Sequence, residues 1–140
     1  MDQALRNAIY DAVEKEPFAK AMNMKLVELE PGFAIVEMIY DPAKMNNLFG
    51  TAHGGALFAL IDEAFEIAGQ TEGTIALALN VNVTYVSTPQ PGIKLRAEAE
   101  RISQTQKTAS YTIKVNDENG SLIATCSALA YRSGKPLPFL

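Results

Sequence analysis

The 140-residue chain contains no tryptophan, a single histidine and a single cysteine. One cysteine, Cys126, cannot form a disulfide within the chain, which fits a reducing compartment. We interpret it as a small buried hydrophobic residue, because no basic residue adjoins it in sequence. One histidine and scattered acidic residues do not make a metal-ligand set, so the sequence predicts neither a metal nor another cofactor.

Positive charge is also scarce. The chain has 12 lysine and arginine residues against 16 aspartate and glutamate residues, a net charge of −4. No basic stripe is present to neutralise phosphates, so a nucleic-acid partner is not expected. No uncharged apolar run approaches the ~20 residues of a membrane span, and residues 1–16 lack the apolar run of a signal peptide. We therefore expect a cytoplasmic protein without a membrane partner.

What the chain does contain is enough apolar sequence for one domain. Hydrophobic residues make up 48% of it, which is ordinary for a globular protein, and its length favours a single domain over residues 1–140. The residue pattern predicts a helix over residues 2–15, a short helix from Pro17 and a hairpin over Lys25–Tyr40. Residues 41–52 are expected to form a loop.

The second half of the chain begins with a long apolar helix, which is expected to run from Gly54 to a C-terminal cap near Gly69. Short turns separate the four segments of alternating polarity that follow, and short turns favour antiparallel pairing. These four predicted strands are Thr74–Ser87, Ile93–Ile102, Ala109–Val115 and Leu122–Tyr131. The tail from Ser133 to Leu140 is expected to be irregular.

A helix this apolar must be covered by other elements. A curved antiparallel sheet of five to six strands, wrapped around a long central helix, is the economical solution, so the sequence predicts an α+β fold. The free edges of such a sheet need pairing or cover. We therefore expect a homodimer with a continuous sheet.

The central helix also carries the two features that point to chemistry. Asp62 lies among leucine, isoleucine and phenylalanine, where a charge is costly unless it is paired or used. The pair Gly54-Gly55 at the helix start leaves N–H groups open to a carbonyl oxygen or an anion. Together they predict an oxyanion-binding end and a base. The alternative is that Asp62 is a charge on a solvated face, beside Glu63 and Glu66.

The spacing Asn47…His53-Gly54-Gly55…Asp62 resembles that of the PaaI-like acyl-CoA thioesterases, which have the hotdog fold. The resemblance covers nearly the whole chain and includes the last two strands. Its segments are PFAKAM, LFGTAHGGALFALIDEAF and NVTYVSTPQPG. The resemblance implies hydrolysis of an acyl-CoA thioester to a free acid and CoA, without a cofactor, by a homodimer that is often paired into a tetramer.

The resemblance also implies roles for residues. It implies that Asp62 is the base or the nucleophile, that Asn47 holds the water or the substrate, and that the Gly54 N–H polarises the thioester carbonyl. Asn47 also suits plain loop chemistry. Some relatives carry a hydroxyl side chain near the positions of Glu66 or Ala78, and this chain carries none there.

Three further residues belong to the predicted substrate-binding end: His53, Gly55 and Glu66. We expect His53 to be a neutral, hydrogen-bonding ring, because a helix N-terminus disfavours its cation. Glu66 either repels Asp62 and raises its pKa, or is a solvated charge. A hotdog hydratase or dehydratase with His53 as the base, and a non-catalytic acyl-CoA binding module, are the alternatives. The HGG sequence and the presence of Asp62 favour the thioesterase.

The helix geometry adds a prediction about assembly. Gly54 and Asp62 are eight residues apart, and a helix rises ~1.5 Å per residue, so they lie ~12 Å apart along its axis. A carbonyl held at Gly54 needs its base or water within about 3 to 4 Å. We therefore expect each active site to be shared by two subunits across a two-fold axis.

Overall fold

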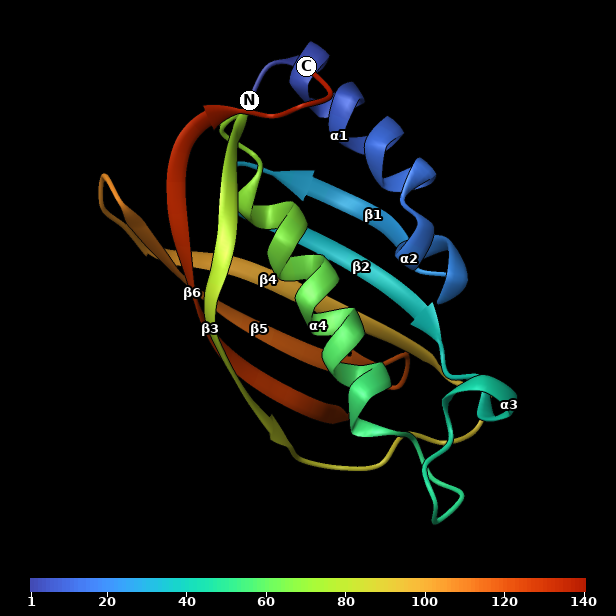
Figure 1. The fold of residues 1–140 in the computed structure, drawn as a ribbon. Helices are drawn as coiled ribbons and strands as arrows, with labels where there is room; N and C mark the ends of the chain where they lie inside the picture. Colours follow the sequence, from blue (N-terminus) through green and yellow to red (C-terminus); the bar gives the residue numbers. More distant parts are fainter.

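The longest helix, α4 (Gly54–Gly69), lies against the concave face of a curved six-stranded antiparallel sheet in this computed structural model, which describes residues 1–140 (Figure 1). The strand order is β1-β2-β4-β5-β6-β3. The strands are β1 (Lys25–Glu30), β2 (Phe33–Ile39), β3 (Thr74–Tyr85), β4 (Lys94–Gln104), β5 (Thr108–Asp117) and β6 (Leu122–Pro136). Helix α4 thus carries the chain across the sheet, from β2 near one edge to β3 at the other. The predicted α+β architecture is confirmed.

Three shorter helices complete the fold. Helices α1 (Gln3–Lys15) and α2 (Pro17–Ala21) lie beside β1 (Figure 1). Asp2 caps α1, because its carboxylate accepts a hydrogen bond of 2.8 Å from the Leu5 N–H, which satisfies a donor that the first turn leaves open. No helix in the protein combines the length and hydropathy that a membrane crossing requires.

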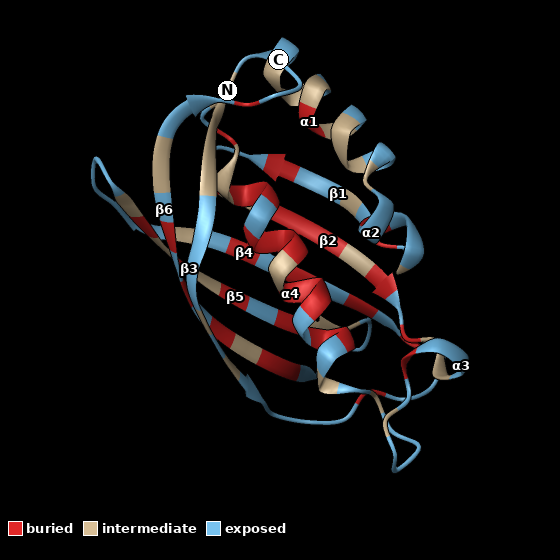
Figure 2. Ribbon diagram, viewed as in Figure 1, coloured by how far each residue is buried: buried red, intermediate tan, exposed pale blue.

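The core lies between α4 and the sheet. Ten of the 16 residues of α4 are buried, and Figure 2 shows the helix lying over the buried stretches of β2, β4 and β5. Burial alternates along β4, where Leu95, Ala97 and Ala99 point inward, as expected for a sheet with one covered face. The rings of Phe65 and Tyr111 meet edge to face, with centroids 5.2 Å apart.

Two local predictions were wrong. The predicted loop over residues 41–52 contains a short helix, α3 (Pro42–Met45), whose Ala43 N–H donates to the Asp41 side chain at 3.0 Å. The tail predicted to be irregular from Ser133 continues β6 as far as Pro136. It stays extended because the start of β3 pairs with it, an interaction between segments far apart in the sequence.

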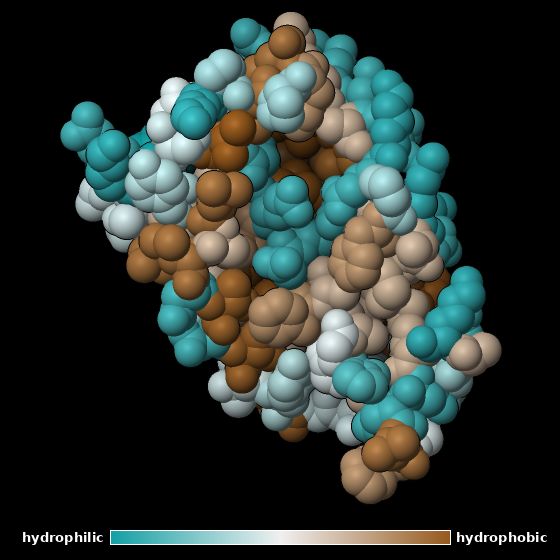
Figure 3. Space-filling model, viewed as in Figure 1, coloured by the Kyte–Doolittle hydropathy of each residue, from teal (hydrophilic) through white to brown (hydrophobic).

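Strand β3 forms one edge of the sheet. It is 12 residues long and contains no charged residue. Leu77 and Leu79 are 55% and 58% exposed, and Figure 3 shows hydrophobic atoms gathered along this strand. A long, uncharged and apolar edge is a template for pairing with another strand.

Candidate active site

The start of α4 is capped by His53. The Nδ1 atom of His53 accepts a hydrogen bond of 2.8 Å from the Gly55 N–H. The predicted hydrogen-bonding role of His53 at the helix start is confirmed, and its neutral state stays a prediction. The expectation that both glycine N–H groups are free is wrong for Gly55, because His53 already occupies that donor.

The N–H of Gly54 donates to no group of the chain. The next peptide group, between Gly54 and Gly55, is held in place, because the Tyr85 hydroxyl donates to the Gly54 carbonyl at 3.0 Å. A Cβ atom at position 54 would lie 3.1 Å from Cζ of Tyr85, so the close approach of the ring favours glycine. These residues line a cavity of about 260 Å³ at the helix start. Nothing in the sequence spacing indicated the hydrogen bond from Tyr85 to the Gly54 carbonyl.

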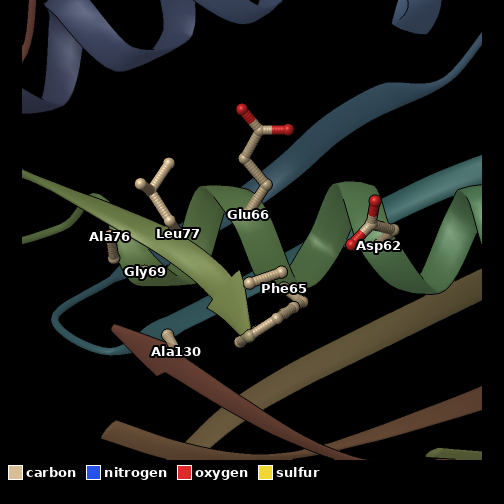
Figure 4. A pocket seen from close by; sticks show the side chains of 8 residues that line it. Asp62, Phe65, Glu66, Gly69, Ala76, Leu77 and Ala130 are labelled. Carbon is tan, nitrogen blue, oxygen red and sulfur yellow. The ribbon is translucent and has the colours of Figure 1, made fainter. Parts of the chain in front are cut away.

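Asp62 lies two turns further along α4 and lines a second cavity, of about 210 Å³ (Figure 4). Its side chain is half-buried, and no hydrogen bond or ion pair of the chain involves it. Burial raises the pKa of Asp62 above its ordinary value of 3.8. A raised pKa makes a carboxylate a stronger base. Asp62 is thus an unpartnered carboxylate facing a cavity.

Glu66 lines the same cavity, one turn after Asp62, and its side chain points away from β6 in Figure 4. The surrounding protein, and then the negative charges of Glu16 and Asp62, raise the pKa of Glu66. The raised pKa of Asp62 comes from burial and not from Glu66. Ala78 also lines the cavity, so the strand facing Asp62 offers no hydroxyl group at this position.

Asn47 is fully engaged in the loop before α4. Its Oδ1 accepts from the N–H groups of Phe49 and Thr51 at 2.9 and 3.1 Å. Its Nδ2 donates to the Thr51 hydroxyl at 2.9 Å and to the Ala52 carbonyl at 3.4 Å. Asn47 lines neither cavity. Within one chain, Asn47 therefore stabilises the loop before α4. Its catalytic role stays a prediction.

The two candidate catalytic groups are not brought together within one chain. Gly54 and Asp62 line different cavities, and the two cavities share no lining residue. The sequence prediction that these groups are too far apart along the helix agrees with this arrangement. A backbone N–H group and a carboxylate, each without a partner, therefore face separate cavities.

A curved antiparallel sheet around a central helix, with a free N–H at the start of that helix and a carboxylate on it, defines a hotdog-fold protein with a candidate hydrolytic site. Residues 49–124 match the family model of the thioesterase superfamily, and the chain belongs to this superfamily as a PaaI-like hotdog thioesterase. The predicted family, fold and enzyme class are confirmed.

Relatives of this chain carry the PaaI name. The chain is 30% identical to the acyl-coenzyme A thioesterase PaaI of Escherichia coli strain K12, over 86% of both chains. The solved structure of the E. coli PaaI protein from the phenylacetic acid degradation operon superposes with a TM-score of 0.89, at 27% identity, over 94% of this chain and 95% of that one. A point mutant of phenylacetic acid degradation protein PaaI from Thermus thermophilus has a TM-score of 0.79, at 35% identity, over 84% and 99%.

Proposed function

We propose that this thioesterase hydrolyses acyl-CoA thioesters, in active sites that each combine Gly54 of one subunit with Asp62 of a second. The substrate class is supported by the name of the E. coli relative. The observation that carries the shared site is that the Gly54 N–H and the Asp62 carboxylate both lack a partner yet line different cavities.

At the helix start, the thioester carbonyl oxygen accepts a hydrogen bond from the Gly54 N–H. The positive end of the α4 dipole also lies there, and both effects stabilise the negative charge that grows on this oxygen. The Tyr85 hydroxyl holds the adjacent carbonyl, so the backbone does not have to reorient during the reaction.

Asp62 supplies the second half of the chemistry. In the base route, it takes a proton from a water molecule while the water oxygen bonds to the carbonyl carbon. The tetrahedral oxyanion then collapses, the C–S bond breaks, and the CoA thiolate takes the proton back from Asp62. In the nucleophilic route, Asp62 itself attacks the carbonyl carbon, CoA leaves, and water hydrolyses the resulting anhydride.

The uncharged edge strand β3 supports the dimer. Antiparallel pairing of β3 with the β3 of a second copy would cover the exposed β3 edge of each copy and join the two sheets into one. Tyr85, the last residue of β3, bonds to the start of α4, whereas Ala76 and Ala78 near the first residues of β3 line the Asp62 cavity. Antiparallel pairing would therefore bring the Gly54 end of one subunit toward the Asp62 cavity of the other. Association of two dimers into a tetramer stays a prediction.

Subunit complementation tests the shared site. The variants Asp62→Asn and Gly54→Pro, each nearly inactive alone, are mixed, and mass spectrometry of differently labelled chains confirms that subunits exchange. Half of the dimers are then mixed, and each mixed dimer has one site with both defects and one with neither. Activity should return to about a quarter of the wild-type value. If mixed dimers form and stay as inactive as their parents, the two groups do not act across the dimer.

A further inference from the structure

Glu63 is a buried acidic residue with no role in the proposed hydrolysis. It follows Asp62 on α4 and is only 3% exposed. Its Oε1 atom is fully buried and has no hydrogen-bond partner. A carboxylate in such a place is strongly destabilising unless a positive charge or a set of donors compensates it.

Two further acidic groups lie close to this carboxylate. One carboxylate oxygen from each of Glu16, Glu63 and Glu66 lies within 4.8 Å of the other two. Glu16 comes from the junction of α1 and α2, and although it occupies the N-cap position of α2, its side chain makes no capping bond. We call these three residues the carboxylate cluster.

No basic side chain neutralises the carboxylate cluster. All six ion pairs of the protein use other acids, which are Glu28, Glu30, Glu37 and Glu72. The one further charge that acts on Glu63 and Glu66 is the carboxylate of Asp62, which is also negative. Three acidic groups from two separate segments therefore converge on a point where the chain itself offers no counter-charge.

We propose that Glu16, Glu63 and Glu66 bind one divalent cation, and that this cation fastens the junction of α1 and α2 to the middle of α4. Carboxylate oxygens are the ligands that hard cations such as Ca²⁺ and Mg²⁺ prefer. Oxygens bound to one Ca²⁺ at about 2.3 to 2.6 Å lie at most about 5 Å from one another, so the spacing of the carboxylate cluster fits Ca²⁺. Mg²⁺, with ligands at about 2.1 Å, requires the carboxylates to move closer together.

The burial of the three side chains suits such a site. Glu63 is buried, Glu16 is half-buried and Glu66 is exposed, so a cation reaches the cluster from the side of Glu66, and water completes its coordination. The cluster is hidden in the sequence, because only the spacing of Glu63 and Glu66 on one helix is visible there. Glu16 joins them only once α1 and α2 have packed.

The competing explanation is that a bound proton, and not a cation, neutralises the Glu63 carboxylate. Burial, then the negative charges of Glu16 and Glu66, and then a hydrogen bond shared with the Glu16 side chain raise the pKa of Glu63 to about 8. A cation-free protein can therefore keep Glu63 neutral at pH 7, and no cation would be needed. The two explanations predict different responses to added cations, and both can be read without measuring hydrolysis.

The test is the melting temperature of chelator-treated protein at pH 8.5, in the presence of CaCl₂, MgCl₂, MnCl₂ or NaCl at matched ionic strength. For the wild type, we expect Ca²⁺ at a hundred times its dissociation constant to raise Tm by about 5 to 10 °C, and titration calorimetry to give one site per chain. Glu63→Gln and Glu66→Gln should lose both signals. Glu14→Gln removes an exposed acid of α1 that lies outside the cluster, so it is the matched control and should keep them.

Two results would overturn the proposal. The first is a wild-type protein whose Tm and calorimetry do not respond to any of the three cations at millimolar concentration. The second is a response that Glu63→Gln and Glu66→Gln retain. If Glu63→Gln does not fold, Glu66→Gln still tests the proposal, because Glu66 is exposed and its substitution should leave the fold intact. A cation-independent wild type together with a Glu63→Gln variant that is more stable at pH 8.5 would identify the proton as the neutralising group.

Discussion

Replacing Gly54 by proline removes the one N–H group on which the proposed oxyanion site depends. Proline has no N–H, and it is well tolerated as the first residue of a helix. The residue before a proline must be extended, and His53 already has φ −65° and ψ 132°, which satisfies that requirement. The substitution therefore deletes a hydrogen-bond donor at a place where the helix itself can accept proline.

The expected loss can be separated from a steric effect. Removing one oxyanion-hole donor lowers kcat by about 10² to 10³, or about 2.7 to 4 kcal/mol. Proline also adds a Cβ atom, which would lie 3.1 Å from the Tyr85 ring. Gly54→Ala adds the same atom and keeps the N–H, so it is the matched control. Tyr85 is 50% exposed, so its ring has room to move by the few tenths of an ångström that both variants require.

The assay is release of free CoA from a panel of acyl-CoA thioesters, detected with a thiol reagent, for wild type, Gly54→Ala and Gly54→Pro. Circular dichroism melting curves establish that both variants are folded. We expect kcat of the proline variant to lie about 10² to 10³ below that of the alanine variant. If the kcat values of the two variants differ by less than about threefold, the Gly54 N–H does not bind the oxyanion, and this step of the proposed mechanism is wrong.

Three further outcomes are expected. Asp62→Asn should cut kcat by about 10² to 10⁴ with folding preserved, and turnover close to wild type would remove Asp62 from the mechanism. Because burial raises the pKa of Asp62 and a base acts only when deprotonated, kcat/KM should fall with decreasing pH at a pH above 3.8, the ordinary value; a pH–rate profile without an acid limb in that range would contradict the assignment. His53→Ala should lower the free energy of unfolding by about 1 kcal/mol through loss of the cap on Gly55, and change kcat far less than Asp62→Asn; loss of kcat in a well-folded variant would instead favour a histidine base.

The parts of the site that could be predicted from the sequence are those encoded by local spacing. The start of α4 at Gly54, a hydrogen-bonding ring at His53 and the apolar surroundings of Asp62 all lie within a stretch of ten residues, where helix periodicity determines which side chains are neighbours. The number and direction of the strands followed from short turns in the same way. One local error remained: the Gly55 N–H, which was expected to be open, donates to the His53 ring.

Features that depend on pairing between distant segments could not be predicted. The length of β6 is determined by β3, which pairs with its last residues. The bond from Tyr85 to Gly54 and the approach of Glu16 to Glu63 join segments that only the folded sheet brings together. The role of Asn47 was ambiguous for another reason, because an asparagine in a loop hydrogen-bonds its own backbone whether or not a substrate also uses it.

The peptide unit between Gly54 and Gly55 is held at both of its polar groups, its carbonyl by Tyr85 and its N–H by His53. Helix ends normally fray well below the temperature at which a protein melts, because their opening costs much less free energy than global unfolding. Here fraying of the first turn of α4 has to break both bonds, and it would disorder the proposed oxyanion-binding N–H of Gly54 at the same time. The upper temperature limit of this enzyme's activity would therefore report the melting of one helical turn, and variants at position 85 would change that limit while the midpoint of global unfolding stayed nearly constant.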